Sequence, residues 1–182
     1  MTQNHQANPT PPVQPADLDV TQLTPAPLQM EGEFIFHAPA TTVFDAVTDP
    51  QNIASWFPTL YDGSTDHSRS ENAGNWGAGS KRYCQTRLMG TLNETILHWD
   101  YPRAYAYNVK NWTMPIKDHC AVMLVEPLGP SQSRFIWRQY YTPIGLFLKY
   151  AFPGMMISMM NRGMADLQQQ LGGPGGQMRQ VR

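Results

Sequence analysis

The stretch from residue 81 to residue 99, KRYCQTRLMGTLNETILHW, predicts two β-strands joined by a tight turn. Met89 and Gly90 separate the two runs, and glycine supplies the positive φ that a two-residue hairpin turn requires. With these two residues as the loop, Arg87 faces Leu92, and directly opposed residues point to the same side of the sheet. The stretch therefore predicts an antiparallel hairpin whose side chains divide between two faces. A register shift of one residue would exchange those faces.

Further strands and helices are expected on both sides of this hairpin. Turn segments such as Asp100-Tyr-Pro-Arg103 and Pro127-Leu-Gly-Pro130 separate short runs, which indicates an antiparallel meander. Asp49-Pro50 predicts a helix start, because aspartate caps a helix and proline suits its first position. The other expected strands are 31–37, 104–112, 119–126 and 133–142, and the expected helices are 43–47, 49–57 and 144–171, the last kinked at Pro153-Gly154. This order predicts an α+β fold in which the final helix covers the apolar face of the sheet.

The composition is that of a globular and nearly neutral protein. Lysine and arginine number 13 against 14 aspartates and glutamates, so the chain lacks the basic excess that favours nucleic-acid binding. Hydrophobic residues make up 41% and charged residues 15%, which indicates a folded rather than a disordered chain. Two cysteines cannot cross-link a fold of this size and are expected to be reduced thiols. Residues 1–14 have no apolar core, so we expect no secretory signal and a cytoplasmic location.

The two ends of the chain differ from its middle. Residues 1–28 hold six prolines, which fix φ and remove backbone donors, so a flexible leader is expected there. The glycine-rich run 172–176 should end the last helix, with 173–182 as a flexible tail and 29–172 as the folded domain. The longest apolar run, 143–160, is interrupted by Lys149 and is shorter than the about 20 residues of a spanning helix. Stable membrane insertion is therefore not expected.

Several segments, in this order, resemble a known superfamily. They are Phe34-Ile-Phe-His-Ala-Pro-Ala40-Thr-Thr-Val43-Phe44, Asp49, Trp56-Phe-Pro58, Gly77-Ala-Gly79-Ser80, Leu92-Asn-Glu94-Thr-Ile96, Tyr105-Ala-Tyr107 and Arg134-Phe-Ile-Trp137. Together they resemble the START-like (Bet v 1-like, SRPBCC) superfamily, in its polyketide cyclase/dehydrase-like branch. The resemblance covers residues 31–171 and implies a helix-grip fold: a curved antiparallel sheet wrapped around a long C-terminal helix, with two short helices near the N-terminus. It also implies a cavity for a hydrophobic small molecule. Residues 61–77 are polar and glycine-rich, with room for one edge strand at their start, and they depart from the family, which usually has a strand here.

The resemblance also implies which face of each strand points toward the cavity. On the hairpin, this face carries Arg87 and Glu94, diagonal neighbours about 7–8 Å apart, which could hold a polar end of a ligand or be a structural pair. Along the last helix, Met156, Met160 and Met164 form a stripe that is typical both of core packing and of adaptable binding surfaces. The expected ligand-binding residues are Trp56, Phe57, Tyr83, Arg87, Leu92, Glu94, Ile96, Tyr105, Tyr107, Met123, Phe135, Trp137, Tyr141, Met156, Met160 and Met164.

The sequence identifies no catalytic residues. Glu94 and His98 share a face but lie about 13 Å apart along a strand, too far for a hydrogen-bonded dyad. His119 and Cys120 are adjacent in a strand and point to opposite faces, so the imidazole cannot activate the thiol. The chain has no Cys-x-x-Cys and no His-Glu-x-x-His, so no metal site is expected. No cofactor is expected either, because Gly77-Ala-Gly79 lacks the third glycine of a dinucleotide-binding loop.

These observations favour one function and leave two alternatives. The favoured function is binding of a hydrophobic or aromatic small molecule, lipid-like or polyketide-like, in a cavity between the sheet and the C-terminal helix. The first alternative is an enzyme of the cyclase/dehydratase kind that acts in the same cavity. The second is a membrane-surface or protein-interaction module that uses the methionine-rich helix. The sequence determines neither the ligand nor the oligomeric state.

Overall fold

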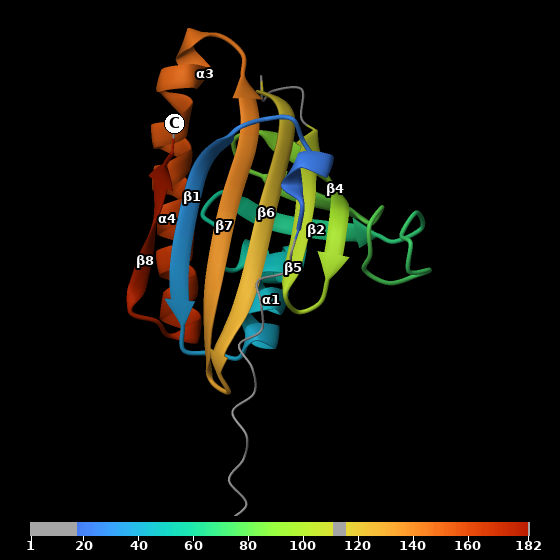
Figure 1. The fold of residues 1–182 in the computed structure, drawn as a ribbon, viewed down its shortest axis with the longest axis vertical. Helices are drawn as coiled ribbons and strands as arrows, with labels where there is room; N and C mark the ends of the chain where they lie inside the picture. The colour runs from blue at the N-terminus through green and yellow to red at the C-terminus, as the bar shows by residue number, and fades with distance from the viewer. Residues whose placement is uncertain (1–17, 111–115, 182) are drawn as a thin grey trace, which may run out of the picture.

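An antiparallel sheet curves around a long C-terminal helix in the computed structural model, which describes residues 18–110 and 116–181 (Figure 1). The elements in chain order are η1 (Val20–Gln22), β1 (Leu28–Phe36), α1 (Ala40–Thr48), α2 (Pro50–Ala54), β2 (Leu60–Asp66), β3 (Lys81–Thr86), β4 (Gly90–Asp100), β5 (Ala104–Lys110), β6 (Ile116–Gly129), β7 (Gln132–Pro143), α3 (Leu146–Tyr150), α4 (Phe152–Leu171) and β8 (Gly175–Gln180). The eight strands follow the order β2-β3-β4-β5-β6-β7-β1-β8, and each neighbouring pair is antiparallel. The predicted α+β helix-grip fold is confirmed. The predicted strand end at Trp112 lies outside the described residues.

The two short helices form where the sequence predicts them. In α1, Val43, Phe44 and Val47 are fully buried and hold the helix against the sheet. A new helix starts at Asp49, whose carboxylate accepts a hydrogen bond from the Gln51 amide at 2.8 Å. This cap separates α1 from α2, so the pair covers one end of the sheet instead of forming one long helix.

The C-terminal helical segment is split, as its proline and glycine predict. The short helix α3 ends at Tyr150, and α4 begins at Phe152 with Pro153 in its first turn. In Figure 1, α4 runs along the sheet on the side away from the viewer, next to β1 and β8. Its buried stripe of Met160, Met164 and Leu167 packs into the inner core. The helix therefore supplies the second wall of the molecule's interior.

A second, smaller cluster of buried side chains covers the outer face of the sheet. It contains Ala104, Ala106, Cys120, Val122 and Leu124, which alternate with inward-pointing residues on β5 and β6. The segment that carries η1 packs its partly buried Leu18, Val20 and Leu23 on this cluster. The expectation of a flexible leader is therefore wrong for residues 18–27, because they cover apolar outer surface. Residues 1–17 of the leader lie outside the described residues.

The expected flexible tail is also wrong, because β8 adds a strand to the edge of the sheet. Residues Gly175–Gln180 pair with β1, and the Met178 side chain is fully buried. Asn161 of α4 fixes the strand, since its Oδ1 accepts a hydrogen bond from the Met178 amide at 2.7 Å. Gly172 has a φ of 77°, which lets the chain leave α4 and turn back toward β1.

The register of the β3–β4 hairpin differs from the predicted one. Arg82, rather than Gln85, lies opposite Glu94, which is a shift of three residues. The loop is the three-residue turn 87–89 instead of Met89-Gly90, and Thr86 stabilises it. The Thr86 hydroxyl donates to the Gly90 carbonyl at 2.8 Å and accepts from the Met89 amide at 2.9 Å. Because three is an odd number, the shift reverses the faces of β3 and leaves Leu92, Glu94 and Ile96 of β4 on the inner face as predicted. The predicted inner place of His98 is wrong, because a bulge after Ile96 puts His98 opposite Ala106 of the outer cluster and turns Trp99 toward the core.

Truncation of Met178 tests whether the C-terminal strand belongs to the folded core. The Met178→Ala variant should lose about 2–5 kcal/mol of free energy of unfolding, because it leaves a hole under β8. Urea denaturation followed by circular dichroism measures the loss. The matched control is Gln177→Ala, since Gln177 is exposed on the same strand and should change stability little. Equal stability of both variants would contradict a packed β8.

Candidate ligand-binding cavity

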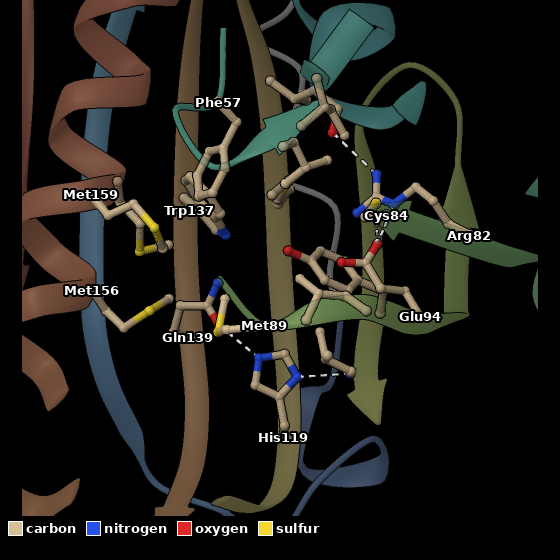
Figure 2. Close-up of a pocket in the computed structure, with 18 of the residues that line it drawn as sticks. Phe57, Arg82, Cys84, Met89, Glu94, His119, Trp137, Gln139, Met156 and Met159 are labelled. Atoms are coloured by element: carbon tan, nitrogen blue, oxygen red, sulfur yellow. Dashed lines mark hydrogen bonds and ion pairs between the residues drawn. The ribbon is translucent and has the colours of Figure 1, made fainter. Parts of the chain in front are cut away.

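A cavity of about 80 Å³ lies between the inner face of the sheet and α4 (Figure 2). Figure 2 shows Met156 and Met159 extending into it from α4, and Arg82, Cys84 and Glu94 approaching from the opposite side. Its wall is mainly apolar, with a few polar groups at separate places. The lining residues are Val47, Ile53, Trp56, Phe57, Leu60, Arg82, Cys84, Met89, Leu92, Glu94, Tyr107, Val109, His119, Met123, Trp137, Gln139, Met156, Met159 and Met160.

Methionines and aromatic rings form most of the apolar wall. Met156 and Met160 are one helical turn apart on α4, and Met159 stands beside them. Phe57 packs against Trp137 with ring centroids 6.3 Å apart, and thus joins the end of α2 to β7. Met89, at the tip of the β3–β4 hairpin, closes the cavity from a third side. The wall therefore combines rigid rings with flexible thioether side chains.

A buried ion pair forms the polar end of the cavity. The Arg82 Nε donates to the Glu94 carboxylate, and Arg82 Nη1 donates to the Thr48 carbonyl at 2.7 Å. Only 2% of the Arg82 side chain and 6% of the Glu94 side chain are exposed. The guanidinium also lies over the Tyr107 ring, 4.8 Å from its centroid. These contacts tie β3 and β4 to the end of α1, and they leave charged groups against an apolar space.

Burial and the guanidinium act in opposite directions on Glu94. Burial raises the pKa of its carboxyl, while Arg82 lowers it by charge and hydrogen bonding. Cys84 donates its thiol to the same carboxylate at 3.7 Å, and burial raises the pKa of that thiol. The cysteine is therefore a protonated, packed side chain and not a nucleophile.

A short hydrogen-bonded chain lies at the other end of the cavity. The Val109 amide donates to His119 Nδ1 at 3.0 Å, and His119 Nε2 lies 2.9 Å from Gln139 Oε1. A backbone amide can only donate, so Nδ1 carries no proton and Nε2 donates to Gln139. Burial lowers the pKa of His119 to about 4, which agrees with a neutral ring. Asp118, with a φ of 55°, forms a bulge that precedes His119 on β6.

The structure brings together some of the sequence-predicted site residues and separates others. Those that line the cavity are Trp56, Phe57, Leu92, Glu94, Tyr107, Met123, Trp137, Met156 and Met160. Those that are buried in the surrounding core, outside the lining, are Ile96, Tyr105, Phe135, Tyr141 and Met164. Tyr83 and Arg87 lie on the other face of β3 and in the exposed turn, so their predicted place at the cavity is wrong. The hairpin register is the cause.

Sequence reasoning did not select several of the polar lining residues. Arg82 and Cys84 were excluded by the incorrect register, although they are the neighbours of Glu94. Gln139 alternates with Trp137 on β7, and His119 alternates with Ala121 on β6, so strand periodicity places both on the inner face. As predicted, His119 points away from Cys120, which is buried in the outer cluster.

Neither a metal-ligand cluster nor a membrane-spanning helix occurs among the described residues. Within residues 18–110 and 116–181, no three histidine, cysteine, aspartate or glutamate side chains come close enough together to hold a metal ion. Among the helices of this part of the chain, none has the length and apolarity needed to span a bilayer.

An antiparallel sheet that grips a long C-terminal helix around an internal cavity defines the helix-grip, START-like class of proteins. Within this class, the chain belongs to the family described as "Polyketide cyclase / dehydrase and lipid transport", which matches residues 27–172. The resemblance stated from the sequence is thereby confirmed. Membership implies a cavity for a hydrophobic ligand and does not specify that ligand.

Solved structures share this fold at low sequence identity. The XoxI protein of Bacillus cereus has a TM-score of 0.61 at 16% identity, over 78% of this chain and 93% of its own. A START superfamily protein from Mycobacterium smegmatis has a TM-score of 0.59 at 12% identity, and the match covers 78% of this chain and 98% of that protein. The di-domain ARO/CYC protein BexL of the BE-7585A biosynthetic pathway has a TM-score of 0.59 at 15% identity, and the match covers 76% of this chain and 44% of that protein. Among curated proteins, none matches the chain in sequence.

Removal of Arg82 tests the buried ion pair. In Arg82→Met, Glu94 becomes a buried carboxylate without a partner, and the free energy of unfolding at neutral pH should fall by about 3–5 kcal/mol. The folded-state pKa of Glu94 then rises further above the ordinary value of 4.5, so the deficit should shrink as the pH is lowered toward that value. Urea denaturation at about pH 7 and about pH 5 measures both effects.

Two controls accompany this variant. Arg87→Met removes an exposed arginine five residues away and should change stability little. The double variant Arg82→Met/Glu94→Leu removes both charges and should recover most of the loss. An Arg82→Met deficit that stays the same at both pH values would contradict an unpaired carboxylate as its cause.

Proposed function

We propose that this protein binds a hydrophobic or aromatic small molecule, lipid-like or polyketide-like, in the cavity between the sheet and α4. The observation that carries the proposal is the wall itself, in which flexible methionines and aromatic rings surround a space with sparse polar groups. Sites of this composition are typical of small-molecule ligands, since burial of apolar surface supplies affinity and a few polar groups fix orientation. Membership in a family that includes lipid transport supports the same function.

The cavity is smaller than the sequence led us to expect. Its volume of about 80 Å³ is well below the roughly 300–1,000 Å³ of typical ligand pockets. The half-buried Met89, Met156 and Met159 occupy the surrounding space. Each methionine has three rotatable side-chain bonds and no branch, so it adapts to a guest at low cost. We infer that a ligand enlarges the cavity by rotating these side chains toward solvent.

Proton transfer in the same cavity is the alternative. An enzyme of the cyclase/dehydratase kind needs a group that exchanges a proton near the working pH. Burial raises the pKa of Tyr105 and Tyr107, and lowers that of His119 to about 4. At neutral pH the phenols keep their protons and the imidazole takes none. These directions favour binding over acid–base chemistry at these three residues, whereas burial raises the pKa of Glu94, so the enzymatic alternative would act through that carboxyl.

The third possibility assigns the methionine-rich helix to a membrane surface or a partner. Leu146, Tyr150 and Met155 are exposed near the junction of α3 and α4 and support such a contact. Within α4, however, Met160 and Met164 are fully buried, so most of the stripe serves the interior. A cytoplasmic location remains a prediction, and the free, buried thiols of the two cysteines agree with it.

A cavity-filling substitution tests binding directly. The probe is N-phenyl-1-naphthylamine, a neutral fluorophore whose emission rises in apolar surroundings. Leu92→Trp places an indole at the half-buried lining and should weaken probe binding at least about tenfold, because it occupies the guest's space. The matched control is Leu88→Trp, since Leu88 is 81% exposed on the hairpin turn. The control should bind the probe as the unmodified protein does.

Two outcomes would contradict the proposal. Equal probe affinity in both variants, with both folded by circular dichroism, would show that the fluorophore binds elsewhere. Absence of binding to the unmodified protein would contradict the cavity as a site for a guest of this class.

A further inference from the structure

Two neighbouring side chains of β7 carry N–H donors in the cavity wall. Among the residues that the structure describes, Trp137 Nε1 is buried without a hydrogen-bond partner, and Gln139 contacts His119 through its oxygen, which leaves its NH₂ group on the other side of the amide. The Trp137 side chain is 4% exposed and Gln139 is 5% exposed. They are two residues apart on β7 and share its inner face. Figure 2 shows both nitrogens on the same side of β7, directed toward the space between the two side chains.

The orientation of the Gln139 amide follows from its neighbours. Beyond the pair Tyr107↔Ala121, the β5–β6 ladder is interrupted, and the Val109 amide donates instead to His119 Nδ1. This obligatory donor leaves the imidazole proton on Nε2, which donates to Gln139 Oε1. The oxygen of the carboxamide is therefore used within the protein, and its NH₂ group is the part presented to the cavity. The backbone of β5 thus determines that this end of the cavity donates hydrogen bonds.

A pair of N–H donors favours a ligand atom that accepts hydrogen bonds. Burial of an unpaired N–H group is unfavourable, so an acceptor at this place gains both hydrogen bonds and relieves that burial. Both donors are neutral, and the charge of Arg82 is matched by Glu94 on the other side of the cavity. A carboxylate would lose its hydration here without a cation in exchange. A neutral carbonyl oxygen has two lone pairs, so it can accept from two donors, and it does so at a smaller desolvation cost.

We propose that Trp137 Nε1–H and Gln139 Nε2–H bind the carbonyl oxygen of an otherwise apolar ligand. This inference rests on the proposed function, and it adds the class of ligand: an aromatic or aliphatic ketone, ester or quinone. The apolar remainder of the ligand lies against the methionine wall of α4. His119 is a positioning residue in this proposal, since it fixes the direction of the Gln139 amide.

Two probes of the same shape test the proposal. In 2-acetylnaphthalene the carbonyl oxygen accepts hydrogen bonds, whereas 2-isopropenylnaphthalene carries a methylene group in its place. Displacement of N-phenyl-1-naphthylamine measures the affinity of each. The ketone should bind about tenfold more tightly than the hydrocarbon. Trp137→Phe and Gln139→Leu should each lower the ratio of ketone affinity to hydrocarbon affinity roughly two- to tenfold, because both probes meet the same change in the apolar wall and only the ketone loses a hydrogen bond. The matched control is Tyr83→Phe, which removes a hydroxyl on the opposite face of β3.

The infrared stretch of the ketone, labelled with ¹³C at its carbonyl, gives a readout that does not depend on stability. A hydrogen-bonded carbonyl absorbs at lower frequency, so the band should shift down in the unmodified protein and move back in Trp137→Phe. Equal affinity for the two probes, or a band without a shift, would overturn the carbonyl site and leave cavity binding intact. Tighter binding of 2-naphthoate than of the ketone would overturn its neutral character. If neither probe displaces the fluorophore, the proposed function fails and this inference with it.

Discussion

The buried ion pair between Arg82 and Glu94 is the interaction on which the cavity depends. It joins β3 to β4, and the same guanidinium reaches the Thr48 carbonyl at the end of α1. The pair is reached only by the register that puts Arg82 opposite Glu94. One side of the cavity is thus held by charged hydrogen bonds in a low-dielectric setting, where such contacts are rigid once they are satisfied.

The opposite side of the cavity is formed by methionine side chains of α4. Met156 and Met159 extend from α4 and are half-buried, and among the described residues their side chains are held by one weak hydrogen bond, from the Thr59 hydroxyl to the Met159 sulfur at 3.6 Å, so a change of rotamer costs little. Between the two sides, β7 contributes Trp137 and Gln139, whose donors face the space. A fixed polar end, an adaptable apolar wall and two donors are the features on which we base the proposal of a site that aligns a guest and adjusts to its shape. They also explain why a cavity of about 80 Å³ is compatible with a larger ligand.

The sequence predicted most of the fold and about half of the cavity wall. Alternation along β7 grouped Phe135, Trp137 and Tyr141 on one face, because each strand carries its own period of two, and the family resemblance identified that face as the inner one. The predicted hairpin register was wrong because it depended on the position of the turn. The glycine at position 90 indicated a two-residue turn, whereas Thr86 closes a three-residue turn. Strand β8 was missed for another reason: its glycine-rich sequence carries no strand pattern, and the free edge of β1 supplies the partner.

The most direct test of the account is the response of individual methionines to a guest. In protein labelled with ¹³C at the methionine methyl groups, NMR spectra are recorded during titration with 2-acetylnaphthalene. The methyl resonances of Met89, Met156 and Met159 should shift together, since these side chains must rotate to admit the ketone. The exposed Met155 and the buried Met178 lie outside the cavity lining, and their resonances should stay in place. Shifts confined to Met155, or no shift at the three lining methionines under saturating ketone, would contradict an interior that opens for a ligand.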